Sequence, residues 1–132
     1  LAPPDPTSRI IPAAEMAAAF AKGGSFIENS EIGWGLARRD GGGDAEVHDV
    51  DTDIFYVFDG AATLVLGGEM VEPGAGQGSA LVASARAAST RGGEAKTVAK
   101  GDVIVIPRGV PHWFSAVTEA PFVYLVVKST PR

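Results

Sequence analysis

The sequence predicts an all-β protein, either a barrel or a sandwich of two sheets, with one short helix near the N-terminus. Short runs rich in Val, Ile and aromatic residues recur along the chain, as is typical of strands. The 17 glycines and nine prolines stand mostly between these runs and indicate tight turns. A chain of 132 residues is long enough for one domain with its own hydrophobic core.

The predicted elements begin with a proline-rich segment, residues 1–9, which we expect to be an arm on the surface or on a neighbouring subunit. In residues 11–24, proline stands near the start, alanines fill the middle and glycines follow the end, which predicts a short helix with a glycine cap. We expect residues 1–30 to form this arm and helix. Residues 31–132 would form the barrel, in a single-domain chain.

About eight to ten strands are predicted after the helix. The clearest runs are residues 32–39, 45–50, 54–58, 62–66, 103–106, 112–117 and 122–127. Asp59-Gly60 predicts a hairpin between two of these runs. A second hairpin is expected around residues 91–94, with arms at 80–89 and 95–99.

Composition excludes several classes of function. The chain has no cysteine, which rules out disulfides, Fe–S clusters, thiolate zinc sites and a cysteine nucleophile. Eleven Lys and Arg against 16 Asp and Glu give a net charge of −5, which argues against nucleic acid or an anionic membrane as a partner. The apolar runs are shorter than the roughly 20 residues that span a bilayer. A soluble protein is therefore expected, either cytoplasmic or exported with a processed N-terminus.

The two histidines of the chain, together with nearby carboxylates, predict a metal site. Glu46 and His48 are two residues apart on a predicted strand, so both side chains project from one face. Asp53 stands where the next strand begins, and a bend can return its carboxylate to the same cluster. His112 follows the turn around Gly109 that ends another strand. This set of nitrogen and oxygen ligands suits one divalent ion such as zinc, iron, nickel, manganese or copper.

Other interpretations of these residues remain open at this stage. A histidine on a strand is often a hydrogen-bonded structural residue, and the acidic run Asp49, Asp51 and Asp53 is also typical of a solvated loop. The run imitates the start of a calcium loop. That loop is excluded because Ile54 stands where glycine is needed and Gly60 where a bidentate glutamate is needed.

Two stretches of the chain resemble the motifs of the cupin family, over residues 45–127. The second cupin motif is matched with every spacing kept, although Ala116 replaces its final asparagine; the matching residues are Gly101, Pro107, Gly109 and His112. The first motif is matched at His48 and Gly60, with Asp53 in the position of the glutamate. Glu46 replaces the first histidine of that motif.

The resemblance implies a jelly-roll barrel, or double-stranded β-helix, with one divalent metal ion inside it. Carried over residue by residue, it makes His48, Asp53 and His112 metal ligands and puts a carboxylate, Glu46, in the place of a histidine. The extra negative charge lowers the Lewis acidity of the ion and favours harder metals than copper. Small cupins often form homodimers, so a homodimer is expected, with the proline-rich arm as a candidate contact.

Alternation along the strands predicts that Phe55, Val57 and Phe114 share the inward face with the predicted ligands. They would line a largely apolar pocket for a small molecule with one coordinating oxygen, or simply fill the barrel core. Three aromatic residues stand at the alternate, outward-facing positions of the strands and are expected to face the second sheet, the helix or a partner subunit; they are Trp34, Tyr56 and Trp113. Single arginines that are typical either of an anion-binding site or of a solvated surface are Arg38, Arg91 and Arg108.

Three functions are compatible with this pattern. The first is a metal-dependent enzyme acting on a small oxygen-bearing organic molecule by oxygenation, isomerisation or elimination, with the reaction itself unspecified. The second is a non-catalytic barrel that binds or stores a small molecule. The third is a cupin barrel whose metal site has degenerated.

Overall fold

A computed structural model describes residues 10–22, 24–27, 32–75 and 85–130, so the proline-rich arm, residues 1–9, lies outside the described residues. One helix, α1, covers Ala13–Lys22. The strands are β1 Gly24–Ile27, β2 Ile32–Arg39, β3 Ala45–Val47, β4 Thr52–Leu66, β5 Glu69–Met70, β6 Gly74–Ala75, β7 Ala85–Ala87, β8 Thr90–Arg91, β9 Glu94–Ala99, β10 Val103–Ile106 and β11 His112–Ser129. The predicted short helix and the all-β class are both confirmed.

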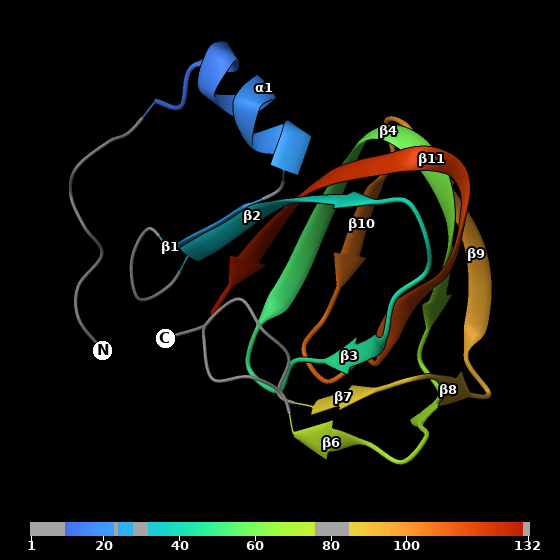
Figure 1. The fold of residues 1–132 in the computed structure, drawn as a ribbon. Coiled ribbons are helices and arrows are strands. Elements are labelled where there is room, and N and C mark those ends of the chain that lie inside the picture. Colours follow the sequence, from blue (N-terminus) through green and yellow to red (C-terminus); the bar gives the residue numbers. More distant parts are fainter. Residues whose placement is uncertain (1–9, 23, 28–31, 76–84, 131–132) are drawn as a thin grey trace.

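Two long strands, β4 and β11, form the spine of the molecule (Figure 1). They pair antiparallel along almost their whole lengths, from Leu66 opposite His112 to Thr52 opposite Ser129. The other edge of β4 pairs with β10 at one end and with β9 at the other, while β11 pairs with β2 and β3. The result is a strongly curved nine-stranded sheet, beside a separate pair formed by β5 and β8.

The predicted hairpin at Asp59-Gly60 is wrong, because the chain bends there without reversing and continues as one strand. Gly60 has a φ of +79°, and its Cα lies against the backbone of β11 near Glu119 and Pro121. The opposing register shifts between Glu119 and Val123. A residue with positive φ and an irregular partner strand make a bulge, which bends the sheet and lets it close. The hairpin expected around residues 91–94 is also wrong, since β8 pairs with β5 and β9 pairs with β4.

Alternation along the strands sets the core, as predicted. On β4, Asp53, Phe55 and Val57 are at most 5% exposed, whereas Ile54 and Tyr56 are 38% and 40% exposed. Aromatic rings fill much of the barrel interior, and the close ring pairs are Phe55–Phe114, Phe55–Tyr124, Phe114–Phe122, Phe114–Tyr124 and Phe122–Tyr124. The expectation that Phe55 and Phe114 face inward is therefore confirmed, and both rings are core as well as cavity residues.

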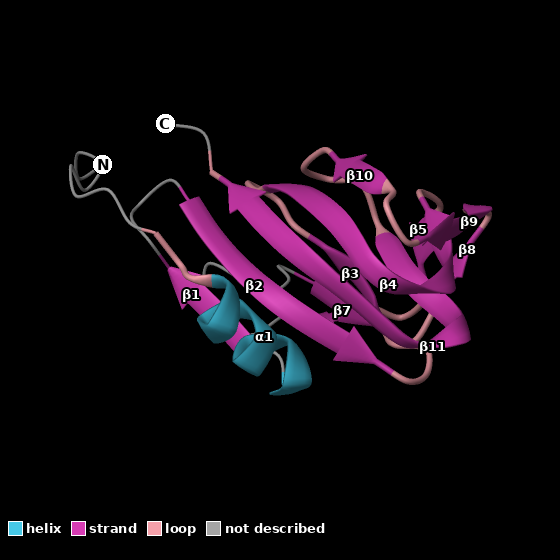
Figure 2. Cartoon of the chain, turned by 90° about the horizontal axis from the view of Figure 1, so that it is seen from above, coloured by secondary structure: helices cyan, strands magenta, loops and turns pink. Residues whose placement is uncertain are grey.

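Helix α1 lies outside the barrel, next to β2 (Figure 2). Phe20 contacts Phe58 of β4, with the ring centroids 4.6 Å apart. Trp34 lines an apolar hollow of about 350 Å³ together with Met16 of the helix, so it faces the helix as expected. Trp113 instead points towards β8, where its Nε1 donates a hydrogen bond to Thr90. Within the described residues, no helix combines the length and the apolar character needed to cross a membrane.

Candidate metal centre

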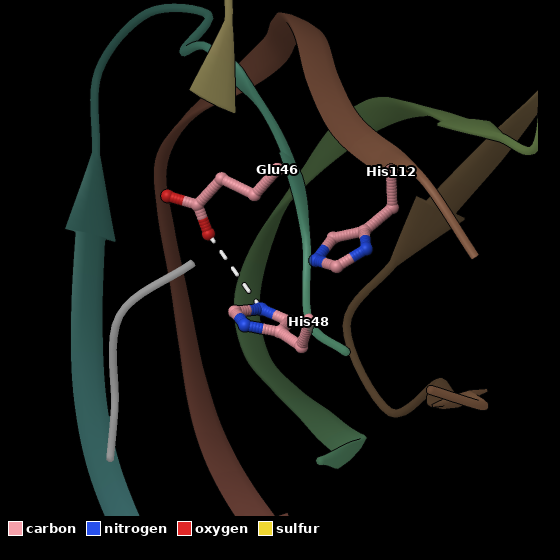
Figure 3. Close-up of side chains that lie close together, drawn as sticks. All are labelled: Glu46, His48 and His112. Atoms are coloured by element: carbon pink, nitrogen blue, oxygen red, sulfur yellow. Dashed lines mark ion pairs between the residues drawn. The ribbon is translucent and has the colours of Figure 1, made fainter. Parts of the chain in front are cut away.

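The four predicted ligands come from three strands and meet inside the barrel. Glu46 lies on β3, His48 directly follows β3, Asp53 lies on β4, and His112 begins β11. Pairing of β3 with β11 places Glu46 opposite His112. Glu46, His48 and His112 present ligand atoms that all lie within 4.8 Å of one another (Figure 3). The sequence pattern therefore predicted a set of residues that the fold brings together.

The turn after β10 ties the two motif regions together. Gly109 has a φ of +82°, and its backbone N–H donates to the carbonyl oxygen of His48 at 2.7 Å. Three residues further on, Nδ1 of His112 lies 3.0 Å from the carbonyl oxygen of Val110. A carbonyl oxygen only accepts, so Nδ1 carries the proton and donates. This bond orients the ring and directs Nε2 towards Asp53.

Asp53 lies at the centre of the cluster and is 1% exposed. On β4 it has Ile106 of β10 on one side and Lys128 of β11 on the other. Its Oδ2 lies 3.1 Å from Nε2 of His48 and 3.4 Å from Nε2 of His112. Its Oδ1 accepts a hydrogen bond of 2.6 Å from Nζ of Lys128.

The protonation of these groups favours a cation between them. Nζ of Lys128 also lies 3.1 Å from Nε2 of His48, and an ammonium can only donate, so this Nε2 presents its lone pair. Because Nδ1 of His112 carries the hydrogen of its bond to Val110, Nε2 is the ring nitrogen that faces Oδ2 of Asp53. The lone pair of His48 Nε2 is directed at Lys128, whereas Oδ2 of Asp53, which lies beside both imidazoles, is buried and has no hydrogen-bond partner among the described residues. A buried carboxylate oxygen without a donor is costly unless a cation or a proton lies beside it.

The distances between these atoms also suit a divalent ion. Ligands about 2.1 Å from an ion lie about 3.4 Å apart in a tetrahedron and about 3.0 Å apart in an octahedron. The observed separations of 3.1 and 3.4 Å, from Oδ2 of Asp53 to the two imidazoles, lie within that range. The donor set at Asp53, His48 and His112 therefore fits a divalent metal ion.

Asp53 is ionised in the folded protein. Burial alone would raise the pKa of its carboxyl group. The neighbouring imidazoles of His112 and His48, and the charge and hydrogen bond of the Lys128 ammonium, outweigh burial and hold the pKa of the carboxyl group well below its usual range. A carboxylate anion is the form that binds metal ions.

Glu46 is less tightly placed than the other three residues. Its Oε2 lies 3.8 Å from Nε2 of His48, and its side chain is 24% exposed. Its Oε1 accepts from Nη1 of Arg86 on β7 at 2.9 Å. Glu46 is thus within reach of the cluster but held at its edge by an arginine. The other two carboxylates of the acidic run, Asp49 and Asp51, differ in burial. Asp51 is buried and accepts a hydrogen bond from Thr130, whereas Asp49 is exposed.

A cavity of about 160 Å³ adjoins the cluster inside the barrel; it is lined by Arg39, Glu46, Asp53, Phe55, Tyr124, Val126 and Lys128. A smaller one of about 30 Å³ shares several of these residues and extends to His112 and Phe114. Nε of Arg39 donates to the Tyr124 hydroxyl at 3.1 Å, and the guanidinium lies 5.7 Å from the centre of the Phe114 ring. Burial raises the pKa of Tyr124, so the hydroxyl is neutral.

Sequence reasoning missed three polar residues of this site, namely Arg39, Tyr124 and Lys128. The exposed arginines it singled out, Arg38, Arg91 and Arg108, do not line the cavity. The missed signal was the period of two along β11, in which Phe122, Tyr124, Val126 and Lys128 share one face. The predicted strand ended at residue 127, one position before the buried lysine.

Comparisons with known proteins bear on the fold of the chain. The family model of the cupin domain (Cupin_2) matches residues 79–128. Among curated protein sequences, none matches this chain. Many solved structures are similar to that of this chain.

A cupin-2 domain protein from Shewanella frigidimarina is 18% identical with a TM-score of 0.56, over 91% of this chain and 94% of that one. A cupin protein from Bacteroides fragilis is 11% identical with a TM-score of 0.57, over 98% and 86%. Hydroquinone 1,2-dioxygenase from Sphingomonas sp., with 4-hydroxybenzoate bound, is 19% identical with a TM-score of 0.56. That match covers 79% of this chain but only 62% of the dioxygenase chain.

At these identities the structural matches show the fold, and they confirm the expected jelly-roll barrel. The residues matched by the family model, 79–128, include the whole second motif with His112, and they also include Lys128. Together, the family-model match and the cupin structures support a small cupin-superfamily protein.

Proposed function

We propose that this cupin binds one divalent metal ion through His48, Asp53 and His112, with Glu46 as a fourth ligand or a nearby base, and that it acts on a small oxygen-bearing organic molecule. The observation that carries the proposal is the buried Oδ2 of Asp53. It has no hydrogen-bond partner among the described residues and lies 3.1 and 3.4 Å from two imidazole nitrogens. Buried acceptors in this arrangement are typical of a site that takes a cation.

The residues around the cluster would have different roles in such a site. When bound, the ion supplies Lewis acidity towards a substrate oxygen, and redox chemistry if it is iron. Glu46 lines the cavity and lies close enough to accept a proton from a substrate there, and its ion pair with Arg86 orients the carboxylate. Phe55 lines both cavities and Phe114 the smaller one, so both rings present apolar surface to a ligand.

The cavity supports a small ligand. A volume of about 160 Å³ accommodates a molecule of only a few heavy atoms or one small ring. The Arg39 guanidinium and the Tyr124 hydroxyl provide donors for its oxygen atoms, next to the aromatic wall. The 4-hydroxybenzoate bound by the structurally similar dioxygenase has this size and chemistry, which supports a small aromatic or carboxylate compound as the first ligand to test.

A second candidate, a non-catalytic barrel that binds a small molecule without a metal, is favoured by one observation. Lys128 already gives Asp53 a cationic partner. In such a barrel the lysine would serve permanently as the counter-ion of the carboxylate, and the protein would bind its ligand equally well with and without metal.

The test is metal content, measured by plasma mass spectrometry on protein prepared without an affinity tag and reloaded separately with zinc, iron, nickel and manganese. Near-stoichiometric metal in the wild type and its loss in His112→Ala are expected. Glu94→Gln, at an exposed carboxylate on β9, is the matched control and should keep its metal. Absence of metal from the wild type after every reloading would refute the metal-dependent function.

A further inference from the structure

Lys128 is an unusual residue in the interior of this barrel. Its ammonium is buried, with the residue 5% exposed, although lysine is almost never fully buried unless it is paired. Nζ lies 2.6 Å from Oδ1 of Asp53 and 3.1 Å from Nε2 of His48. Both of these residues are proposed metal ligands, so the lysine contacts the cluster itself.

The two contacts have different consequences for a metal ion. The bond to Oδ1 of Asp53 leaves Oδ2 available. The contact with His48 uses the lone pair of Nε2, which is the same lone pair that a metal would need, because an ammonium has donors only. In addition, an ammonium and a divalent ion that share two ligands would lie within a few ångströms and repel each other strongly in a buried, low-dielectric site.

We propose that Lys128 is an internal cation that competes with the metal ion for His48 and Asp53, so that metal binding requires its ammonium to leave His48. This inference rests on the proposed metal-dependent function. The residue has a place to go, because Lys128 also lines the 160 Å³ cavity. The cavity offers the ammonium new acceptors, the Glu46 carboxylate and the Tyr124 hydroxyl.

The proposal assigns Lys128 a role in setting metal affinity, which differs from a purely structural role. If Lys128 only oriented Asp53, its removal would loosen a ligand and weaken metal binding. If it competes with the ion, its removal frees the His48 lone pair and removes a repulsive charge, so metal binding becomes tighter. The two roles predict changes of opposite sign in the same measurement.

The experiment is calorimetric titration of the chelator-treated protein with zinc chloride and with manganese chloride. Lys128→Met and Lys128→Gln are compared with the wild type, and Lys96→Met is the control because Lys96 is 55% exposed and pairs only with Glu94 among the described residues. We expect both Lys128 variants to bind metal roughly tenfold to a hundredfold more tightly, the scale of effects from groups that contact metal ligands. The Lys96 variant should match the wild type.

A measurement on the wild type does not depend on how the variants fold. Brief labelling with an amine-reactive reagent, read by peptide mass spectrometry, should show Lys128 becoming more reactive at saturating zinc, with Lys96 and Lys100 unchanged. Equal or weaker metal binding by Lys128 variants that fold, or unchanged Lys128 labelling in zinc-loaded wild type, would overturn the proposal while leaving the metal site intact. Absence of binding by every protein, the variants included, would overturn the proposed function as well.

Discussion

The ion pair between Asp53 and Lys128 makes a quantitative prediction about stability. The two side chains are 1% and 5% exposed, and Nζ lies 2.6 Å from Oδ1. Removing one member of a buried pair leaves the other charge uncompensated, which typically costs about 3–5 kcal/mol. We expect Asp53→Asn to lower the free energy of unfolding by about this amount. Lys128→Met should cost less, because without the ammonium Nε2 of His48 no longer has to accept and can instead carry a hydrogen and donate it to Oδ2 of Asp53.

The double variant Asp53→Asn/Lys128→Met carries neither charge, so its loss should be smaller than the sum of the single losses by about 1–3 kcal/mol. Urea unfolding in the presence of a chelator, followed by tryptophan fluorescence, measures all four proteins of the cycle. The exposed pair Glu94–Lys96, with nearly the same separation of 3.0 Å, is the control and should give a coupling below about 1 kcal/mol. Additivity of the Asp53 and Lys128 losses within about 0.5 kcal/mol would refute the reasoning.

Further predictions concern the barrel and its pocket. Gly60→Ala should lower the stability of the protein by about 3 kcal/mol or more, because a Cβ there meets the backbone of β11 and the positive φ is strained for alanine. Gly109 has a similar φ, but a Cβ there would meet no atom within 4 Å. Gly109→Ala should therefore cost only about 1–2 kcal/mol, measured by thermal unfolding. Burial raises the pKa of Tyr124 above its unfolded value, so the stability from its neutral hydroxyl is present below about pH 10 and is lost as pH rises through the folded pKa. Tyr124→Phe should flatten the alkaline loss of stability and the exposed-site control Tyr56→Phe should not; equal alkaline profiles for both variants would contradict this.

Much of the fold could be predicted because buried and more exposed residues alternate along β10 and the first half of β4. The inward positions of β4 carry buried residues and the outward positions carry half-exposed ones, as expected for a sheet with one buried face. The error at Asp59-Gly60 shows the limit of local signals. A glycine with positive φ serves a hairpin and a bulge equally well, and the difference depends on whether the partner strand continues past it, which β11 does.

The candidate site was predictable where spacing carries the information. Glu46 and His48 follow the period of a strand, and His112 follows a turn whose glycine is needed to bond the His48 carbonyl. Asp53 was predicted to return to the cluster through a bend after His48, and the structure places it at the centre of the cluster. Arg39 gave no comparable signal, because an arginine beside another arginine at a strand end is equally typical of a solvated surface.

Lys128 takes part both in the strand pairing of the barrel and in the candidate metal site. It is the register partner of Asp53, and it shares the inward face of β11 with Phe122 and Tyr124. A slip of one residue would turn the lysine and both rings outward together, so the apolar pattern that fixes the register also fixes the ammonium against the carboxylate. The core does not depend on the charge at position 128, because the rings occupy other positions of that face. Substitution of Lys128 should therefore alter metal binding strongly while the barrel is retained. A change in metal affinity at this position can then be separated from a change in the fold.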